Sequence, residues 1–189
     1  MVGIQKSLFP ERTTAELIKD IEKLTIEIQE LYCLDEIPLI VGYSGGKDST
    51  AVLQLIWNAI ATLPVEKRTK KIYVITTDTR VENPYVSAWV KQSLKNIERV
   101  AQEQKMPIET HLLQPDIQYT YWVGLIGKGY PAPRLKFRWC TGRLKIEPSN
   151  LFIRNAVRTN GEVILVLGTR KAESVNRART MKRLEEKRV

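Results

Sequence analysis

The chain has 189 residues, of which 43% are hydrophobic and 27% charged, and its formal net charge is +9. This length fits one domain, residues 1–189, with a substantial core, and the composition excludes a disordered protein. No run of 18 apolar residues and no apolar signal core occurs, so we expect a cytoplasmic protein with no membrane partner. With one histidine, His111, and two cysteines, Cys33 and Cys140, we expect no Ser-His-Asp triad, histidine-rich metal site or disulfide framework.

The positive charge is concentrated in the last third of the chain. Residues 1–133 carry 15 Lys and Arg against 16 Asp and Glu, whereas residues 134–189 carry 15 against 5. Such asymmetry favours a polyanionic partner. The alternative is a basic C-terminal helix whose charges are only solvated.

The first predicted element is an amphipathic helix over residues 13–33, within an N-terminal segment that we place at residues 1–35. Thr13 and Glu16 fit a capping box, and apolar residues recur every three or four positions from Leu17 to Leu31. Cys33 lies in this helix and is expected to be a buried structural thiol.

Short β-branched or apolar runs then alternate with helical patterns. Strands are expected at residues 39–43, 71–77, 107–113 and 162–168, and helices at 48–61, from Asn83-Pro84 onwards, at 148–159 and at 174–189. The intervening residues 114–148 are expected to form a long functional loop region around a short helix at 117–126. The pattern predicts an α/β fold: a Rossmann-like, doubly wound, mostly parallel sheet of four to five strands with helices on both faces.

The first strand runs into a glycine loop, "SGGKDS", at residues 44–49. Backbone amides of such a loop, with the first turn of the next helix, bind phosphate oxygens, and glycines allow the backbone to approach the ligand. A Walker A loop would need four residues between its glycines and Ser or Thr after the lysine. Here three residues separate Gly42 from Gly46, and Asp48 follows Lys47, which argues against a kinase or GTPase.

The loop resembles that of the PP-loop ATP pyrophosphatases, whose pattern is SGG-x-DS. The resemblance implies an adenine nucleotide α-hydrolase-like fold and cleavage of ATP, with Mg²⁺, between the α and β phosphates. Asp48 would then join the magnesium shell or merely cap the helix. The residues expected to bind nucleotide in this loop are Tyr43, Ser44, Gly45, Gly46, Lys47, Asp48 and Ser49, of which Lys47, Asp48 and Ser49 are also expected to be catalytic.

Two further segments are similar to the phosphoadenylylsulfate (PAPS) reductase branch of that superfamily. "GTRKAES", residues 168–174, is similar to its G-x-R-x-x-ES motif, and "WCTGRLKIEP", residues 139–148, to its CC-x-x-RK-V-x-P segment. "TTDT", residues 76–79, lies where the branch places a strand end against adenosine. Asp78 would orient ribose or metal, or simply occupy a turn. The expected nucleotide-binding residues from these segments are Thr77, Asp78, Thr79, Gly168, Arg170, Glu173 and Ser174, with Arg170 also catalytic.

The combination of "PRLKFRWCTGRLKIEPSNLFI", residues 133–153, with "LGTRKAES", residues 167–174, looks most like the DNA-phosphorothioation sulfurtransferases, the DndC family, and the resemblance covers nearly the whole chain. It implies that ATP cleavage activates a DNA backbone phosphate for sulfur insertion. That resemblance implies DNA, a cysteine desulfurase and other phosphorothioation proteins as partners, and a longer full-length protein that alone holds a 4Fe-4S cluster. Cys140 would be a cluster ligand or a sulfur acceptor. A group of basic residues with interleaved aromatics is expected to bind DNA or substrate phosphate: Arg134, Lys136, Arg138, Arg143 and Lys145. The alternative is that these residues bind the phosphates of a bound nucleotide. A sulfonucleotide reductase and a tRNA-thiolating enzyme stay open as alternative functions.

Overall fold

The structure is a computed structural model that describes residues 13–134, 137–170 and 174–185. The α-helices and strands follow one another as α1 (Thr14–Leu34), β1 (Leu39–Gly42), α2 (Lys47–Ala61), β2 (Ile72–Thr77), α3 (Pro84–Glu103), β3 (Ile108–Leu113), α4 (Trp139–Thr141), α5 (Glu147–Asn160), β4 (Ile164–Leu167) and α6 (Val175–Glu185). Short 3₁₀ turns occur at η1 (Val65–Lys67) and η2 (Ile117–Tyr119), and π-helical turns at η3 (Val123–Gly127) and η4 (Gly142–Ile146).

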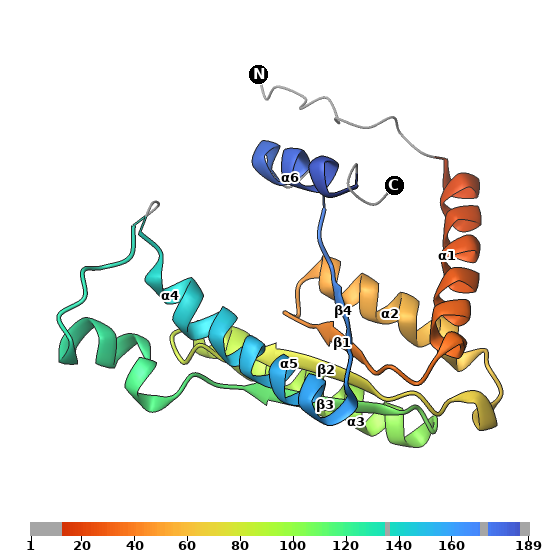
Figure 1. Ribbon diagram of the computed structural model, residues 1–189, viewed down its shortest axis with the longest axis horizontal. Coiled ribbons are helices and arrows are strands. Elements are labelled where there is room, and N and C mark those ends of the chain that lie inside the picture. The colour runs from red at the N-terminus through yellow and green to blue at the C-terminus, as the bar shows by residue number, and fades with distance from the viewer. Residues whose placement is uncertain (1–12, 135–136, 171–173, 186–189) are drawn as a thin grey trace.

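The four strands form one parallel sheet in the order β3-β2-β1-β4. Helices α2 and α3 cover one face, where Leu53 and Leu94 join Val41 and Val74 in the core. On the other face α5 lies against β2 and β3 (Figure 1), and its Phe152 ring contacts the rings of Tyr73 and His111. The predicted α/β fold with a parallel sheet between helices is therefore confirmed.

The strand order reverses direction at β1. The chain moves outward from β1 to β2 and β3, and then returns through α5 to place β4 on the opposite side of β1. Helix α2, which follows β1, and helix α5, which precedes β4, lie on opposite faces of the sheet, and in such folds the ligand crevice lies at the carboxyl ends of the two strands. Both motif-bearing loops, "SGGKDS" and "GTRKAES", start there.

Helix α1 begins with the predicted capping box, in which Thr13 N donates to Glu16 Oε2 at 2.8 Å and Glu16 N donates to Thr13 Oγ1 at 3.3 Å. It packs on α2, and its C-terminus is fixed by the buried Lys70, whose Nζ donates to Leu31 O at 2.9 Å and to Asp35 Oδ1 at 2.7 Å. The prediction of a buried Cys33 is wrong: this thiol is exposed, because Tyr32 next to it occupies the inward face.

A second correction concerns residues 139–148, which were expected to be loop. They are helical and run through α4 and η4 into α5, so Cys140 lies on a helix. Pro148 indicated a helix start because proline lacks the N–H for an α-helical bond. The π-helical turn η4 ends at Ile146, two residues before Pro148, close to the point where the regular bonding would be interrupted in any case.

The boundaries of the four strands agree with those predicted from the sequence to within two residues. Asn83 caps α3 as expected, accepting a hydrogen bond from Tyr85 N at 2.9 Å. Within the described residues, no helix has the length and apolar character needed to cross a membrane.

Candidate nucleotide-binding site

The glycine loop is closed by hydrogen bonds between its two serines. Ser49 Oγ donates to Gly46 O at 2.9 Å and accepts from Ser44 N at 3.2 Å, and the two hydroxyl oxygens lie 3.1 Å apart. Ser49 is buried, whereas Lys47 is exposed. Gly46, the N-cap of α2, makes no side-chain cap bond, so the amides of the first helical turn keep their capacity to bind an anion.

Gly45 is required for a reason that the sequence did not reveal. Its φ is +72°, and a Cβ built on it would lie only 2.3 Å from Cζ3 of Trp89 in α3. The indole therefore rests on the loop. Trp89 packs on the glycine loop instead of the core and stays 53% exposed.

The loop after β4 meets the glycine loop directly. A Cβ on Gly168 would lie 2.8 Å from Asp48 O and 3.0 Å from Ser49 N, so only glycine allows this approach of two backbones. Arg170 Nε then pairs with Asp48 Oδ2 at 3.0 Å. The ion pair joins the two motifs across the point where the strand order reverses, which brings together two of the predicted catalytic residues.

The end of β2 supplies the third wall of the site. Thr76 Oγ1 donates to Tyr43 O, and the hydroxyl oxygens of Thr77 and Ser149 lie 3.2 Å apart. Asp78 accepts from Arg80 N at 2.9 Å and pairs with Lys91 Nζ at 3.1 Å.

Both oxygens of the Asp78 carboxylate are thus engaged by protein groups. Burial by itself raises the pKa of this carboxyl, but the Arg80 amide and the Lys91 ammonium outweigh burial and hold the pKa below its ordinary value. Asp78 therefore stays ionised at neutral pH. Its bonds fit the turn alternative given above, although the side chain also lines the cavity described next.

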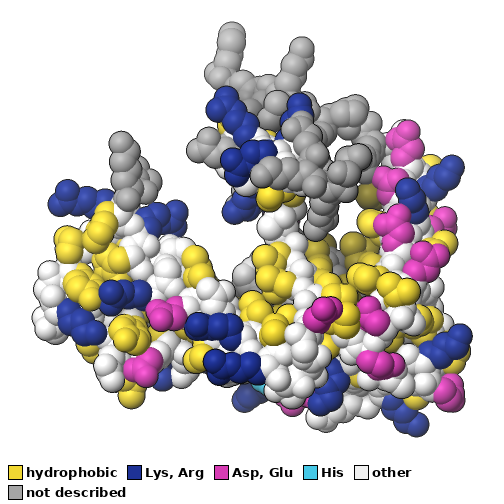
Figure 2. Space-filling model, in the orientation of Figure 1, with side chains coloured by type: hydrophobic (Ala, Val, Ile, Leu, Met, Phe, Trp, Pro, Cys, Tyr) yellow, Lys and Arg dark blue, Asp and Glu magenta, His cyan; other side chains and the backbone are white. Residues whose placement is uncertain are grey.

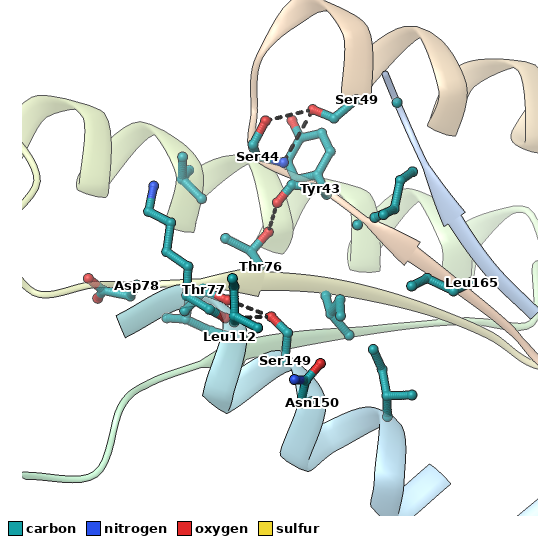
Figure 3. A pocket seen from close by; sticks show the side chains of 18 of the residues that line it. Tyr43, Ser44, Ser49, Thr76, Thr77, Asp78, Leu112, Ser149, Asn150 and Leu165 are labelled. Carbon is teal, nitrogen blue, oxygen red and sulfur yellow. Dashed lines mark hydrogen bonds between the residues drawn. The ribbon is translucent and has the colours of Figure 1, made fainter. Parts of the chain in front are cut away.

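A cavity of about 520 Å³ opens beyond the carboxyl ends of β1, β2 and β4. Hydroxyl-bearing residues and Asp78 line one part, while Ile75, Ile153 and Leu165 supply apolar surface (Figure 3). Pockets for small organic ligands commonly have this size and this mixture of apolar walls and few polar groups. Of the residues predicted to bind nucleotide, those that line the cavity are Tyr43, Ser44, Ser49, Thr77, Asp78 and Gly168.

The other predicted residues lie outside the cavity wall. They belong to the two motif segments that adjoin the cavity or, in the case of Thr79, are buried: Gly45, Gly46, Lys47 and Asp48 of "SGGKDS", Arg170 of "GTRKAES", and Thr79. Ser174 caps α6, since its Oγ accepts from Arg177 N at 3.2 Å. Glu173 and Lys136 lie outside the described residues.

Sequence reasoning missed several residues that line the cavity. Lys91 and Ser87 come from α3, Ser149 and Asn150 from α5, and Leu165 and Leu167 from β4. Leu165 and Leu167 face the same side of the sheet because they are two positions apart on β4, but all four residues of this strand are apolar, so the sequence did not show which side faces the cavity. Nothing in the local sequence marks Ser149 or Lys91.

The predicted basic group separates into two parts. Lys145 lines the cavity and pairs with Glu82 Oε1 at 3.4 Å. Arg143 instead donates to the Tyr130 hydroxyl at 2.8 Å and lies over the ring of Tyr130 at 4.8 Å.

Arg134 and Arg138 are exposed and are absent from the cavity wall. The nucleotide-phosphate alternative therefore applies to Lys145 alone among the described members of this group. The remaining cations lie on a different surface of the molecule.

Cys140 is partly exposed on α4. The described residues contain no group of three or more His, Cys, Asp or Glu side chains arranged to hold a metal ion. The whole sequence has two cysteines, whereas a 4Fe-4S cluster is normally held by four thiolates. The residues of this chain do not fit such a cluster, and no step of the chemistry below uses one.

Residues 38–188 match the model of the phosphoadenosine phosphosulfate reductase domain. The chain belongs to this family. The match spans both motif loops, and the expectation of an enzyme is confirmed at the level of the family.

Two similar proteins place the domain in longer chains. An uncharacterised protein of Methanocaldococcus jannaschii, MJ0066, is 33% identical over 147 residues, which are 78% of this chain and 25% of that protein. The U34-tRNA thiolase NcsA from Methanococcus maripaludis, solved with its 4Fe-4S cluster, has a TM-score of 0.55 at 14% identity, covering 93% of this chain and 53% of that one. The chain thus spans a quarter to a half of these proteins, and the second likeness concerns the fold alone.

Proposed function

We propose that this chain binds ATP and cleaves it to AMP and pyrophosphate, as the nucleotide domain of a sulfur-transfer enzyme. The observation that carries the proposal is the junction of the two motif loops, where Gly168 contacts the backbone of Asp48 and Ser49 and where Arg170 pairs with Asp48. This junction lies at the N-terminus of α2 and at the mouth of the cavity, so one ligand can occupy both.

The two parts of the site suit the two parts of ATP. The apolar wall from Ile75, Ile153 and Leu165 fits a purine, and Thr77, Asp78 and Ser149 are placed to bond with a ribose. The polyphosphate would lie over the glycine loop, where the α2 amides, Lys47 and Arg170 stabilise negative charge as pyrophosphate leaves. The attacking group is an oxygen of the acceptor, or water when no acceptor is present; this oxygen forms the new bond to the α phosphorus as the bond from that phosphorus to the bridging oxygen breaks. Catalysis at this end is electrostatic, since no side-chain nucleophile is required.

Magnesium fits the site through one carboxylate. Mg²⁺ is commonly bound by one or two carboxylates together with substrate phosphates and water, and Asp48 offers a partly exposed carboxylate at the loop. When bound, the ion would neutralise phosphate charge. Asp48 would have to share its oxygens between the ion and Arg170, and that sharing would orient Arg170 toward the phosphates.

The test is the identity of the products and the dependence on the loop. Incubation with ATP and Mg²⁺ should release AMP and pyrophosphate, and Ser49→Ala should lower the rate about a hundredfold because it opens the Ser44–Ser49 closure of the loop. Thr159→Ala, at the exposed end of α5, is the matched hydroxyl control and should leave the rate unchanged. Release of ADP and phosphate would refute the proposal.

A sulfonucleotide substrate is the second candidate. It is supported by the match to the phosphoadenosine phosphosulfate reductase domain over residues 38–188. The same cavity would accept the adenosine, and Arg170 would face sulfate in place of the β phosphate. Calorimetry with ATP and with phosphoadenosine phosphosulfate separates the two, and tighter binding of the sulfonucleotide would favour this candidate.

The sulfur acceptor is a finer question. The likeness of fold to a tRNA thiolase supports an RNA acceptor, whereas the segment around Cys140 gave the prediction of a DNA backbone phosphate. The prediction that a cysteine desulfurase and other phosphorothioation proteins are partners has no support beyond that resemblance. Transfer of ³⁵S from a cysteine desulfurase into tRNA or into DNA distinguishes the acceptors, and label in neither would exclude sulfur transfer by this chain under those conditions.

A further inference from the structure

A separate lobe carries the cations that the cavity does not use. Residues 117–146, which we name the aromatic lobe, extend from the end of β3 and return through α4 and η4 to α5 (Figure 1). This segment contains six Lys and Arg residues and six aromatic residues, and no Asp or Glu. In Figure 2 it belongs to the lobe at the left, where dark-blue side chains lie among yellow ones and some magenta side chains, which come from outside residues 117–146, appear in the lower part.

The aromatic rings of the lobe form a preassembled stack. Tyr121 and Trp139 stack with ring planes 16° apart at 5.6 Å, and Tyr130 meets Trp139 edge-on at 5.3 Å. Trp139 Nε1 donates to Pro131 O at 3.0 Å, and a Cβ on Gly124 would lie 2.8 Å from this indole. The stack is thus fixed by contacts inside the lobe.

The outermost ring of the stack is left open to solvent. Trp122 stands perpendicular to Tyr121 at 5.2 Å and is 57% exposed. Phe137, which forms an isolated antiparallel bridge with Arg134, is 49% exposed. A fixed, exposed indole loses little conformational freedom when a planar ligand stacks on it.

Cations flank these rings, and among the described residues no ion pair joins Lys128, Arg134 or Arg138 to a carboxylate. Lys128 donates to Gln118 O at 2.8 Å and lies over the Tyr119 ring at 4.9 Å. Arg134 and Arg138 are exposed on either side of Phe137. Lys145, at the base of the lobe, is the member paired with a carboxylate, that of Glu82.

We propose that the aromatic lobe binds single-stranded nucleic acid, with bases stacked on Trp122 and Phe137 and phosphates held by Lys128, Arg134 and Arg138. Cations that follow a backbone, together with aromatic faces that accept any base, are the two features of sites for single strands. An acidic polypeptide would satisfy the cations but would give the indole no planar partner. A duplex would shield its base faces from Trp122.

Lys145 belongs to both the lobe and the cavity wall, so a strand bound on the lobe leads toward the nucleotide site. The inference therefore names a partner for the chain whose nucleotide chemistry is proposed above. The role of a bound strand rests on the proposed function, whereas strand binding itself is measured without nucleotide. A failure of strand binding and a failure of ATP cleavage are thus separate results.

The experiment is fluorescence anisotropy with labelled 12-nucleotide single strands of oligo-dT and oligo-U, the matching duplex and polyglutamate, without nucleotide. Single strands should bind at least about tenfold tighter than duplex or polyglutamate, with affinity falling steeply between 50 and 200 mM salt, as roughly −0.7 per neutralised phosphate predicts. The ratio of the two single strands identifies RNA or DNA as the preferred source.

Matched variants decide whether the lobe is responsible. Trp122→Ala should weaken single-strand binding about tenfold and Trp122→Phe by less. Ile126→Ala, a truncation of an even more exposed apolar side chain in the same lobe, should not change it. Arg138→Gln should reduce the salt slope by about 0.7, and Lys95→Gln on α3 should not. An unchanged urea midpoint shows that each variant is folded. Equal binding of duplex or polyglutamate, or unchanged binding by Trp122→Ala, would overturn the proposal.

Discussion

The contact between Gly168 and the N-terminus of α2 can be tested by adding a single methyl group. In Gly168→Ala the new Cβ would lie 2.8, 2.9 and 3.0 Å from three backbone atoms, Asp48 O, Asp48 C and Ser49 N. Backbone atoms cannot rotate away as a side chain would, so the two loops must separate by about 0.5 Å to reach normal contact. Overpacking of this kind costs about 1–3 kcal/mol of folding free energy.

The same displacement would separate the two motif loops. We expect Gly168→Ala to lower AMP formation about tenfold or more, since sub-ångström misplacement of catalytic groups is costly. The assays are urea unfolding and pyrophosphate release. Gly142→Ala is the matched control: nothing lies within 4 Å of its Cβ, and alanine in a helical turn should stabilise the fold by up to about 1 kcal/mol. The reasoning fails if Gly168→Ala unfolds within about 0.5 kcal/mol of the unsubstituted chain.

Three further predictions concern Lys70, Asp78 and Trp89. Lys70→Met should destabilise the fold by about 3 kcal/mol in urea unfolding, because it removes the fully buried ammonium that pairs with Asp35. Lys71→Met, which changes an exposed lysine, should cost less than about 1 kcal/mol. Similar losses for the two variants would contradict the anchoring role of Lys70. The pKa of Asp78 is lowered in the folded protein, so its ionised carboxylate stabilises the fold above the unfolded pKa of about 3.8, and this stabilisation is lost as the pH falls through the folded pKa. Asp78→Asn should therefore weaken the fall of the free energy of unfolding at acid pH. An unchanged fall would contradict this role. Trp89→Ala should weaken ATP binding about tenfold in calorimetry and Trp89→Phe by less; equal affinities would mean that the indole does not hold the loop.

Much of the fold was predictable because its signals are local. The Thr13–Glu16 capping box, the Asn83 cap and the apolar strand cores depend on neighbouring residues, and each occurs as expected. The position of Pro148 misled for the same reason: a local rule indicated a helix start, but a π-helical turn before it lets the helix begin at Trp139.

The candidate site was predictable only where it follows a motif. Ser44, Ser49 and Gly168 line the cavity as the motifs implied. Trp89 and Ser149 reach the site through tertiary packing of α3 and α5, which the sequence around them does not encode. Cys33 shows the converse: an amphipathic pattern predicts which residues share a helix face, but it does not say which of them a neighbouring helix covers.

The position of β4 has a consequence for how the site is made. Leu39 pairs with Ile164, 125 positions later, so the two halves of the site are joined by one of the longest-range pairings in the sheet. Strands β1, β2 and β3 can pair through successive crossovers, whereas the site is incomplete until the last strand inserts beside β1. During synthesis, residues 162–170 must therefore leave the ribosome before the two motif loops can form the candidate site. Under the proposed function, ATP binding would therefore report completion of the fold, and the ligand should stabilise the β1–β4 edge more than any other part of the sheet.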